Sequence, residues 1–217
     1  MTSEGEAMSR IERREMLRRL GAAPVAAGFA LSEARAERAH EHVRRGAKTS
    51  GRQEESYERR FFDEHEWATV GVLADLVLPA DGRSGSATEA GVPAFIDYIL
   101  TDELAEPRES EEMQTALRGG LAWLDRECRA RSSRSFLECE DAQKREVLDA
   151  IAWPERAAPE MSQGVAFFNV FRDLVASGFW TTEMGMDDIG YMGNMFVAEW
   201  TGCPPEVLAK LDLPPKT

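Results

Sequence analysis

The chain has 217 residues, of which 43% are hydrophobic and 30% are charged, and its formal net charge is −13. This balance is that of one globular domain with a substantial core. Residues 1–36 hold six Arg and five Glu, a net charge of +1, so the remainder of the chain carries −14. The acidic balance argues against a nucleic-acid surface and does not favour an anionic lipid surface, because both require clustered Lys and Arg.

The N-terminus has the form of an export signal. Arg13 and Arg14, with Leu17 and a basic residue behind them, resemble the twin-arginine motif. The apolar run that follows, Leu20–Leu31, has about a dozen residues, and a bilayer span needs about 20. We therefore predict a twin-arginine signal over residues 1–36, read by the twin-arginine translocase, and a periplasmic location. The alternative is an amphipathic N-terminal helix in which the arginines pair by chance.

A cleavage site and a polar segment follow the apolar run. Ala34 and Ala36 form the small-x-small pattern that signal peptidases cut. Residues 37–60 are almost wholly polar, which predicts a linker or a disordered mature N-terminus. His40 and His42 fall in this segment as His-x-His. Without supporting carboxylates or cysteines, we expect a solvated pair and not a metal site.

The first two helices of the domain are marked by clear boundary residues. Asp63 and Glu66 have the spacing of a capping box, and Pro79 ends the helix that they begin. The loop over residues 80–91 contains neither phosphate-binding glycine motif, so a dinucleotide or P-loop site is excluded. Pro93 fits the first turn of the next helix.

Four more helices are predicted by apolar residues at helical spacing, and no alternating run predicts a strand. They are a helix capped by Ser110, Asp141–Trp153, Gln163–Ser177 and a helix within Gly178–Pro204. The third of these is the most apolar and is predicted to be central. The sequence thus predicts one all-α domain of about six helices over residues 61–211 and a tail over 212–217.

The segment Gly178–Pro204 concentrates glycine, aromatic residues and methionine. We predict that Gly178 ends the preceding helix and that Asp187 or Asp188 caps the next one. Glycine weakens a helix by roughly 1 kcal/mol relative to Ala, so Gly190 and Gly193, three residues apart, indicate close backbone approach by another segment. The apolar stripe of the predicted helix consists of Ile189, Met192, Phe196 and Trp200.

Two strings carry a family resemblance: A-D-L-V-L-P-A-D within residues 73–99, and G-F-W-T-T-E-M-G…I-G-Y-M-G-N…W-T-G-C-P over 178–204. Together they resemble the gluconate 2-dehydrogenase subunit 3 family over about residues 61–204. The resemblance implies a non-catalytic small subunit that binds a FAD-dependent (GMC-type) sugar or polyol dehydrogenase, often with a multihaem cytochrome c as electron acceptor. It also implies that this chain holds no cofactor. The resemblance further implies that the export signal of this chain carries a folded flavoprotein that has no signal of its own.

The partner interface is expected within the same glycine-rich segment. Buried aromatic side chains dominate interface energies, so we expect Trp180, Tyr191 and Trp200 to be the anchors. Each of the three could instead belong to the chain's own core. The predicted interface residues are Trp180, Gly190, Tyr191, Gly193, Asn194 and Trp200.

The cysteines show no cofactor-attachment pattern. Cys128, Cys139 and Cys203 form no C-x-x-C-H, the motif that attaches a c-type haem. In an exported protein Cys128 and Cys139 could form a disulfide; otherwise they are inert, buried thiols. The sequence also lacks a pair of Glu-x-x-His motifs and a G-x-S-x-G elbow. A stand-alone periplasmic binding module and an enzyme in its own right stay open as alternatives.

Overall fold

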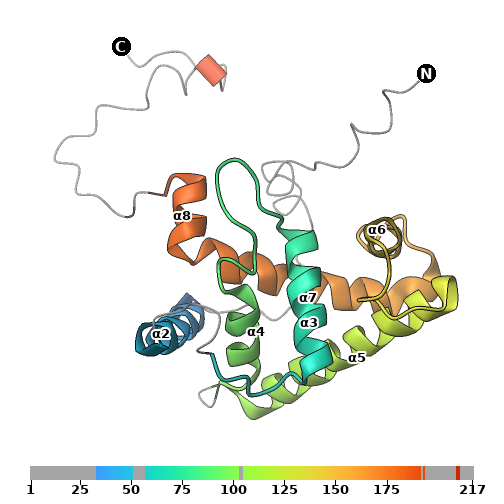
Figure 1. The fold of residues 1–217 in the computed structure, drawn as a ribbon, viewed down its shortest axis with the longest axis horizontal. Helices are drawn as coiled ribbons and strands as arrows, with labels where there is room; N and C mark the ends of the chain where they lie inside the picture. The colour runs from blue at the N-terminus through green and yellow to red at the C-terminus, as the bar shows by residue number, and fades with distance from the viewer. Residues whose placement is uncertain (1–32, 51–56, 103–104, 192, 194–208, 211–217) are drawn as a thin grey trace.

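The computed structural model describes residues 33–50, 57–102, 105–191, 193 and 209–210. This part of the chain folds into α-helices and one short 3₁₀ turn, with no strand among the described residues, so the all-α prediction is confirmed. The elements are α2 (Glu33–Ser50), α3 (Glu64–Val77), α4 (Val92–Leu100), α5 (Pro107–Ser132), α6 (Asp141–Asp149), η1 (Pro159–Met161), α7 (Ser162–Trp180) and α8 (Glu183–Ile189). Figure 1 shows their arrangement.

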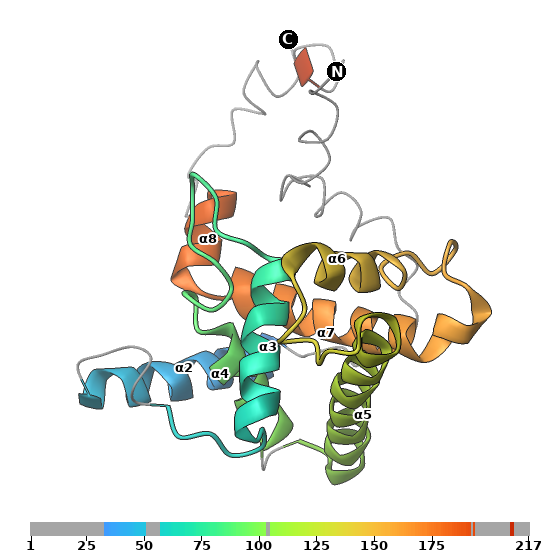
Figure 2. The same ribbon diagram turned by 45° about the vertical axis from the view of Figure 1, so that its right-hand side comes forward.

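Helix α7 is the centre of the fold, as its apolar sequence predicts. It packs against α2, α3, α4, α5 and α8. In both ribbon views α3 and α4 lie side by side across α7, while α5 and α6 lie toward its N-terminal half (Figures 1 and 2). The largest fully buried side chains come from several of these helices and include Phe95, Leu73, Leu124, Phe171 and Phe179. One continuous hydrophobic core therefore joins them.

Helices α5 and α7 approach closely because each places an aromatic ring on a glycine of the other. A Cβ atom at Gly120 of α5 would lie 1.8 Å from Cδ2 of Phe167 on α7. A Cβ atom at Gly164 of α7 would lie 2.3 Å from Cη2 of Trp123 on α5. Both rings are buried. Any larger residue at either glycine must displace a core ring, so the crossing requires glycine at both places.

The start of α3 is fixed as the capping box predicts. The backbone N–H of Glu66 donates to Asp63 Oδ1 at 2.7 Å, and that of Asp63 donates to Glu66 Oε2 at 3.0 Å. The helix ends at Val77, two residues before Pro79. Both predicted boundaries of this helix are confirmed.

A buried carboxylate holds the chain that enters α3. Asp97 on α4 is fully buried. Its two oxygens accept hydrogen bonds from the backbone N–H groups of three consecutive residues, at 2.8 to 3.1 Å, and from the Tyr57 hydroxyl at 2.9 Å. The backbone donors are Arg60, Phe61 and Phe62. Burial and the neighbouring Asp97 carboxylate raise the pKa of Tyr57 well above its usual value. Asp97 thus supplies acceptors to a stretch of backbone that lies outside any helix.

Several predicted helix ends are displaced. Helix α5 begins at Pro107, so Ser110 lies in its first turn and is not its cap. Helix α6 ends at Asp149, short of the predicted Trp153. Helix α7 does not end at Gly178, which is buried under the Phe95 ring; a Cβ atom there would lie 2.8 Å from Phe95 Cδ1. This glycine admits a neighbouring helix and does not break its own.

The polar linker predicted over residues 37–60 is wrong for its first part, because residues up to Ser50 belong to helix α2. The helix packs against α4 and α7 through small side chains, with Ala36 and Ala39 buried. The solvated histidine pair is also wrong. His40 is only 8% exposed and stacks on Phe95, with ring centroids 4.7 Å apart, and His42 stacks on Tyr98 at 4.6 Å. The buried face consists of alanine, arginine and histidine, in a segment whose overall composition is polar.

Replacing Gly120 by Ala should destabilise the protein by about 1–3 kcal/mol, because the new methyl group overpacks the Phe167 ring. Gly119 is the matched control: it is the preceding residue of the same helix, and a Cβ atom there meets nothing within 4 Å. Gly119→Ala should therefore stabilise the protein by up to about 1 kcal/mol through helix propensity. Urea unfolding of the full chain, followed by circular dichroism, measures both. Equal effects would contradict the ring-on-glycine packing.

The stability of the fold should depend on pH through His40. Burial, with a smaller effect of the Arg44 charge, lowers the pKa of His40 to about 4, from about 6.5 in an unfolded chain. Because the unfolded state binds the proton more tightly, this contribution to the free energy of unfolding is complete above about pH 6.5. It is lost as pH falls toward 4, at up to about 1 kcal/mol per pH unit.

His40→Gln should remove this part of the pH dependence and leave that of the carboxylates. The measurement is the difference between the wild-type and variant unfolding free energies at several pH values from 4 to 7. A difference that does not change over this interval would contradict the assignment to His40.

Candidate partner-binding site

Helix α8 is fixed to the end of α7 by a cap and a close backbone contact. Thr182 is its N-cap, and the Thr182 hydroxyl accepts from the backbone N–H of Gly185 at 3.0 Å. Gly185 is buried, and a Cβ atom there would lie 2.1 Å from the carbonyl oxygen of Phe179. The absence of a side chain at Gly185 lets the first turn of α8 rest on the α7 backbone.

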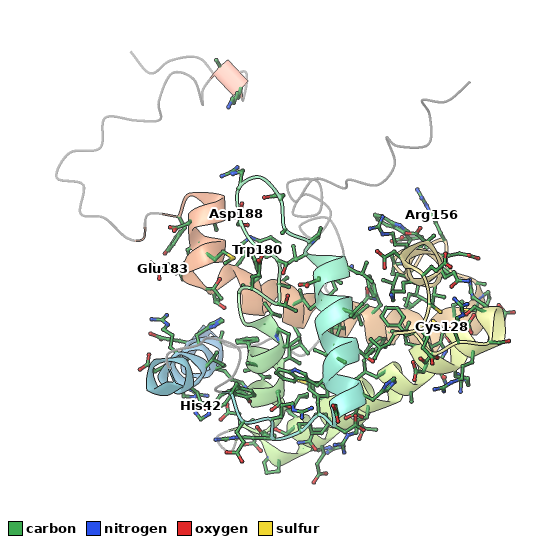
Figure 3. All side chains as sticks on the ribbon, in the orientation of Figure 1. His42, Cys128, Arg156, Trp180, Glu183 and Asp188 are labelled. Atoms are coloured by element: carbon green, nitrogen blue, oxygen red, sulfur yellow. The ribbon has the colours of Figure 1, made fainter. Side chains whose placement is uncertain are left out.

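The loop over residues 80–91 holds the other end of α8. Arg83 Nη2 donates to the carbonyl oxygen of Asp188 at 2.6 Å, and its Nε lies 3.8 Å from Asp188 Oδ1. The loop is itself tied to α3, because the Asp75 carboxylate accepts from the backbone N–H and the hydroxyl of Thr88 at 2.8 and 2.7 Å. Figure 3 shows Asp188 beside this loop. Helix α8 is therefore held at both ends.

Three large hydrophobic side chains are exposed on α8 and just after it, beside the exposed acidic side chains of Glu183 and Asp187. Met186, Ile189 and Tyr191 are 36%, 49% and 54% exposed, and they are the large hydrophobic side chains most exposed to solvent in the described part of the chain. All three lie within six residues of one another, on α8 or just after it. We call them the α8 patch. Single exposed hydrophobic residues are ordinary, but three of them on and beside one short, fixed helix make the α8 patch the candidate interaction surface.

The predicted interface residues fall in three different places. Tyr191 belongs to the α8 patch. Trp180 is half-buried at the end of α7, packs edge-on against Phe179 at 5.7 Å, and its buried indole N–H has no acceptor among the described residues. Asn194 and Trp200 lie outside the described residues. The aromatic residues are thus divided between core and surface.

Gly190 and Gly193 serve a different purpose from the one predicted. Their φ angles are 67° and 73°, the left-handed region that favours glycine, and Gly190 is the C-cap that ends α8. A Cβ atom at either glycine meets nothing within 4 Å among the described residues. The predicted close backbone approach is therefore wrong for the described part of the chain. Asp187 and Asp188 lie in the last turn of α8 and do not cap a new helix.

Met186 and Ile189 were missed as surface candidates. The sequence predicts Ile189 on an apolar stripe of a helix that continues through Gly190, whereas α8 ends at Ile189. The signal that could have found the true end is Gly190 itself, since glycine just after the last helical residue is a common helix terminator. With α8 ending there, Ile189 faces solvent, and the other three residues of the stripe lie outside the described residues.

The two cysteines predicted to pair are brought together. Cys128 on α5 and Cys139 before α6 are both buried. The Ser132 hydroxyl donates to the carbonyl oxygen of Cys128 at 2.8 Å and lies 3.2 Å from Cys139 Sγ. Burial and the adjacent Cys139 thiol raise the pKa of Cys128 to about 12. Both are free thiols in the structure, and the disulfide stays a prediction; Cys203 lies outside the described residues.

The polar cluster around Asp125 has a structural role. Asp125 on α5 accepts from the backbone N–H of Phe136 at 2.9 Å, and it lies 2.8 Å from His65 Nε2 and 3.2 Å from Arg129 Nη2. These contacts tie the start of α3 and the turn before α6 to α5. Among the described residues no three His, Cys, Asp or Glu side chains are grouped as a metal site would require. In the same part of the chain no helix is long and apolar enough to cross a bilayer.

The described part of the chain is thus an all-α domain with a group of exposed hydrophobic side chains at its α8 end. A family model for gluconate 2-dehydrogenase subunit 3 matches residues 64–199, which is well over half of the chain, so the chain belongs to that family. The family is named for a subunit of a dehydrogenase complex, and an accessory role in such a complex is consistent with this membership. Searches among curated proteins and among solved structures found no match.

Proposed function

We propose that this chain is the non-catalytic small subunit of a periplasmic FAD-dependent (GMC-type) sugar or polyol dehydrogenase. In this role it escorts the flavoprotein subunit through twin-arginine export and stabilises it. The observation that carries the proposal is the family match over residues 64–199. FAD and the sugar belong to the partner, and a c-type cytochrome subunit is the proposed electron acceptor.

The α8 patch is the proposed contact surface for the flavoprotein. Its three side chains expose apolar area that a partner would remove from water, at about 25 cal/mol per Å². Anchoring by Thr182 and Arg83 keeps the helix in place while the patch is exposed. A rigid, exposed surface that includes an aromatic residue, here Tyr191, has the character of a protein interface.

Stabilisation follows from mass action and requires no chemistry in this chain. A subunit that binds only the folded flavoprotein stabilises that state by RT ln(1 + [L]/Kd), about 2.7 kcal/mol when its concentration is 100 times Kd. The amount of folded, active partner would rise, while the turnover of each bound flavin would stay the same. An enzyme subunit would instead change the chemical step.

The double variant Ile189→Ser, Tyr191→Ser should weaken binding to the flavoprotein by roughly thirty-fold or more, because truncated interface anchors commonly cost about 2 kcal/mol. Arg156→Ser is the control, since Arg156 is exposed at the far end of the molecule in Figure 3. Affinity is measured by titration of the purified subunits, with kcat per bound flavin recorded in the same samples.

The proposed stabilising role requires that kcat per flavin stays constant in every complex that forms. Unchanged binding by the patch variant would remove the α8 patch from the interface. Sugar oxidation or a stoichiometric flavin in the lone chain would favour the alternative that the chain is an enzyme.

The double variant Arg13→Lys, Arg14→Lys keeps the charge of the signal but should abolish export, because the translocase recognises the arginine pair. Both this chain and the flavoprotein should then remain in the cytoplasm, and cell fractionation with immunodetection of each subunit measures this. The double variant Arg10→Lys, Arg19→Lys, which replaces two arginines of the same segment outside the motif, is the control. Continued export of the flavoprotein in the first variant would contradict the escort role.

A further inference from the structure

The first turn of α2 is anchored in the folded domain. Arg35 is 8% exposed; its Nη2 donates to the carbonyl oxygen of Ile99 at 2.9 Å, and its Nε lies 3.4 Å from Asp102 Oδ2. Arg38, one turn later, donates to the same carboxylate oxygen at 3.3 Å. Asp102 follows α4 and is only 5% exposed. The pair Arg35–Asp102 is therefore a buried link between α2 and the end of α4.

The next turn of α2 is docked as firmly. Ala36 and Ala39 are 4% and 0% exposed. His40 stacks on Phe95 of α4, and its Nε2 lies 2.5 Å from the hydroxyl of Thr181, just after α7. Figures 1 and 2 both show α2 lying against α4. The helix is continuous through these contacts from Glu33 onward.

This arrangement conflicts with cleavage after Ala36. A protease reaches a peptide bond only where the chain opens locally. The bond after Ala36 lies inside α2, with the buried residues Arg35 and Ala36 before it and the exposed Glu37 after it. A cut after Ala36 would also remove Arg35. Asp102 would then lose the buried arginine of its ion pair, and loss of one partner of a buried ion pair is destabilising. A mature chain that began at Glu37 would lose part of its own core contact.

We propose that the Ala34–Ala36 site is not used in the folded subunit, and that the signal is removed N-terminal to Glu33 so that the mature chain keeps all of α2. Sequence patterns suited to such a cut occur upstream, for example Gly28-Phe29-Ala30, which would give a mature chain beginning at Leu31. Helix α2 is then a permanent part of the mature domain. The inference rests on the proposed export.

The direct test is the N-terminus of the mature protein. The full chain, tagged at its C-terminus, is produced with its flavoprotein, purified from the periplasm, and analysed by intact mass and N-terminal sequencing. The proposal expects an N-terminus at or before Glu33. An N-terminus at Glu37 would overturn it.

An uncut chain found in the cytoplasm would contradict the proposed export but would not test the docking of α2. A second measurement therefore tests the docking directly. Trypsin cuts after arginine, so the rate of cleavage at Arg35–Ala36 reports the docking of α2 directly. Rates are normalised to the same bond in the urea-unfolded chain. We expect at least about ten-fold protection in the folded wild type.

Asp102→Ala and Ala39→Glu should each abolish this protection, the first by removing the ion pair and the second by placing a charge on the buried face of α2. Ala39→Glu changes α2 itself and leaves the contacts among α3, α4, α5 and α7 intact, so it is informative even where Asp102→Ala fails to fold. Asp173→Ala, on the exposed part of α7, is the control and should leave protection unchanged. Rapid cleavage at Arg35 in the folded wild type would overturn the proposal.

Discussion

The whole domain depends on the crossing of α5 and α7, where two aromatic rings rest on two glycines. Phe167 covers Gly120 and Trp123 covers Gly164, so the helices exchange one ring each. The same device recurs where Phe95 of α4 covers Gly178 of α7. These close approaches set how near α5 and α4 lie to α7, the helix that contacts most of the others. A core built this way is dense and tolerates little added volume at the contacts.

Buried carboxylates organise the connections between the helices. Asp97 collects the backbone N–H groups before α3, Asp125 ties the turn before α6 to α5, and Asp102 links α4 to α2. Asp97 and Asp125 satisfy backbone donors that would otherwise be buried without partners, and such orphaned donors cost about 1–3 kcal/mol. The irregular segments are thus fixed by single acidic residues supplied by α4, α5 and the turn after α4.

The sequence predicted well those features that follow from local chemistry. The Asp63–Glu66 capping box, the stop before Pro79 and the central place of α7 all depend on neighbouring residues or on a strong apolar pattern. Features decided by tertiary contacts were not predictable in this way. Gly178 looks like a helix terminator in sequence, yet Phe95, more than 80 residues away, requires a glycine inside the helix. Helix α2 looks polar because alanine, arginine and a stacked histidine form its buried face.

The candidate site was predicted only in part, because the exposure of its side chains also depends on the three-dimensional structure. Tyr191 was found because an aromatic residue beside glycine in a family-type string is conspicuous. Met186 and Ile189 were missed because their exposure depends on where α8 ends, and that end is set by the positive φ of Gly190. The resemblance identified the segment, but only the backbone shows which of its side chains reach solvent.

The contact between Arg83 and Asp188 bears on the entropy of the proposed association with the flavoprotein. It joins two segments 105 residues apart and restrains α8 before any partner arrives. Conformational freedom that a loose helix would give up on docking is given up here during folding of the chain itself, so less of it opposes association. A surface that is ordered before binding needs little rearrangement to form the complex. Differences in affinity between partners then lie mostly in the dissociation rate constant.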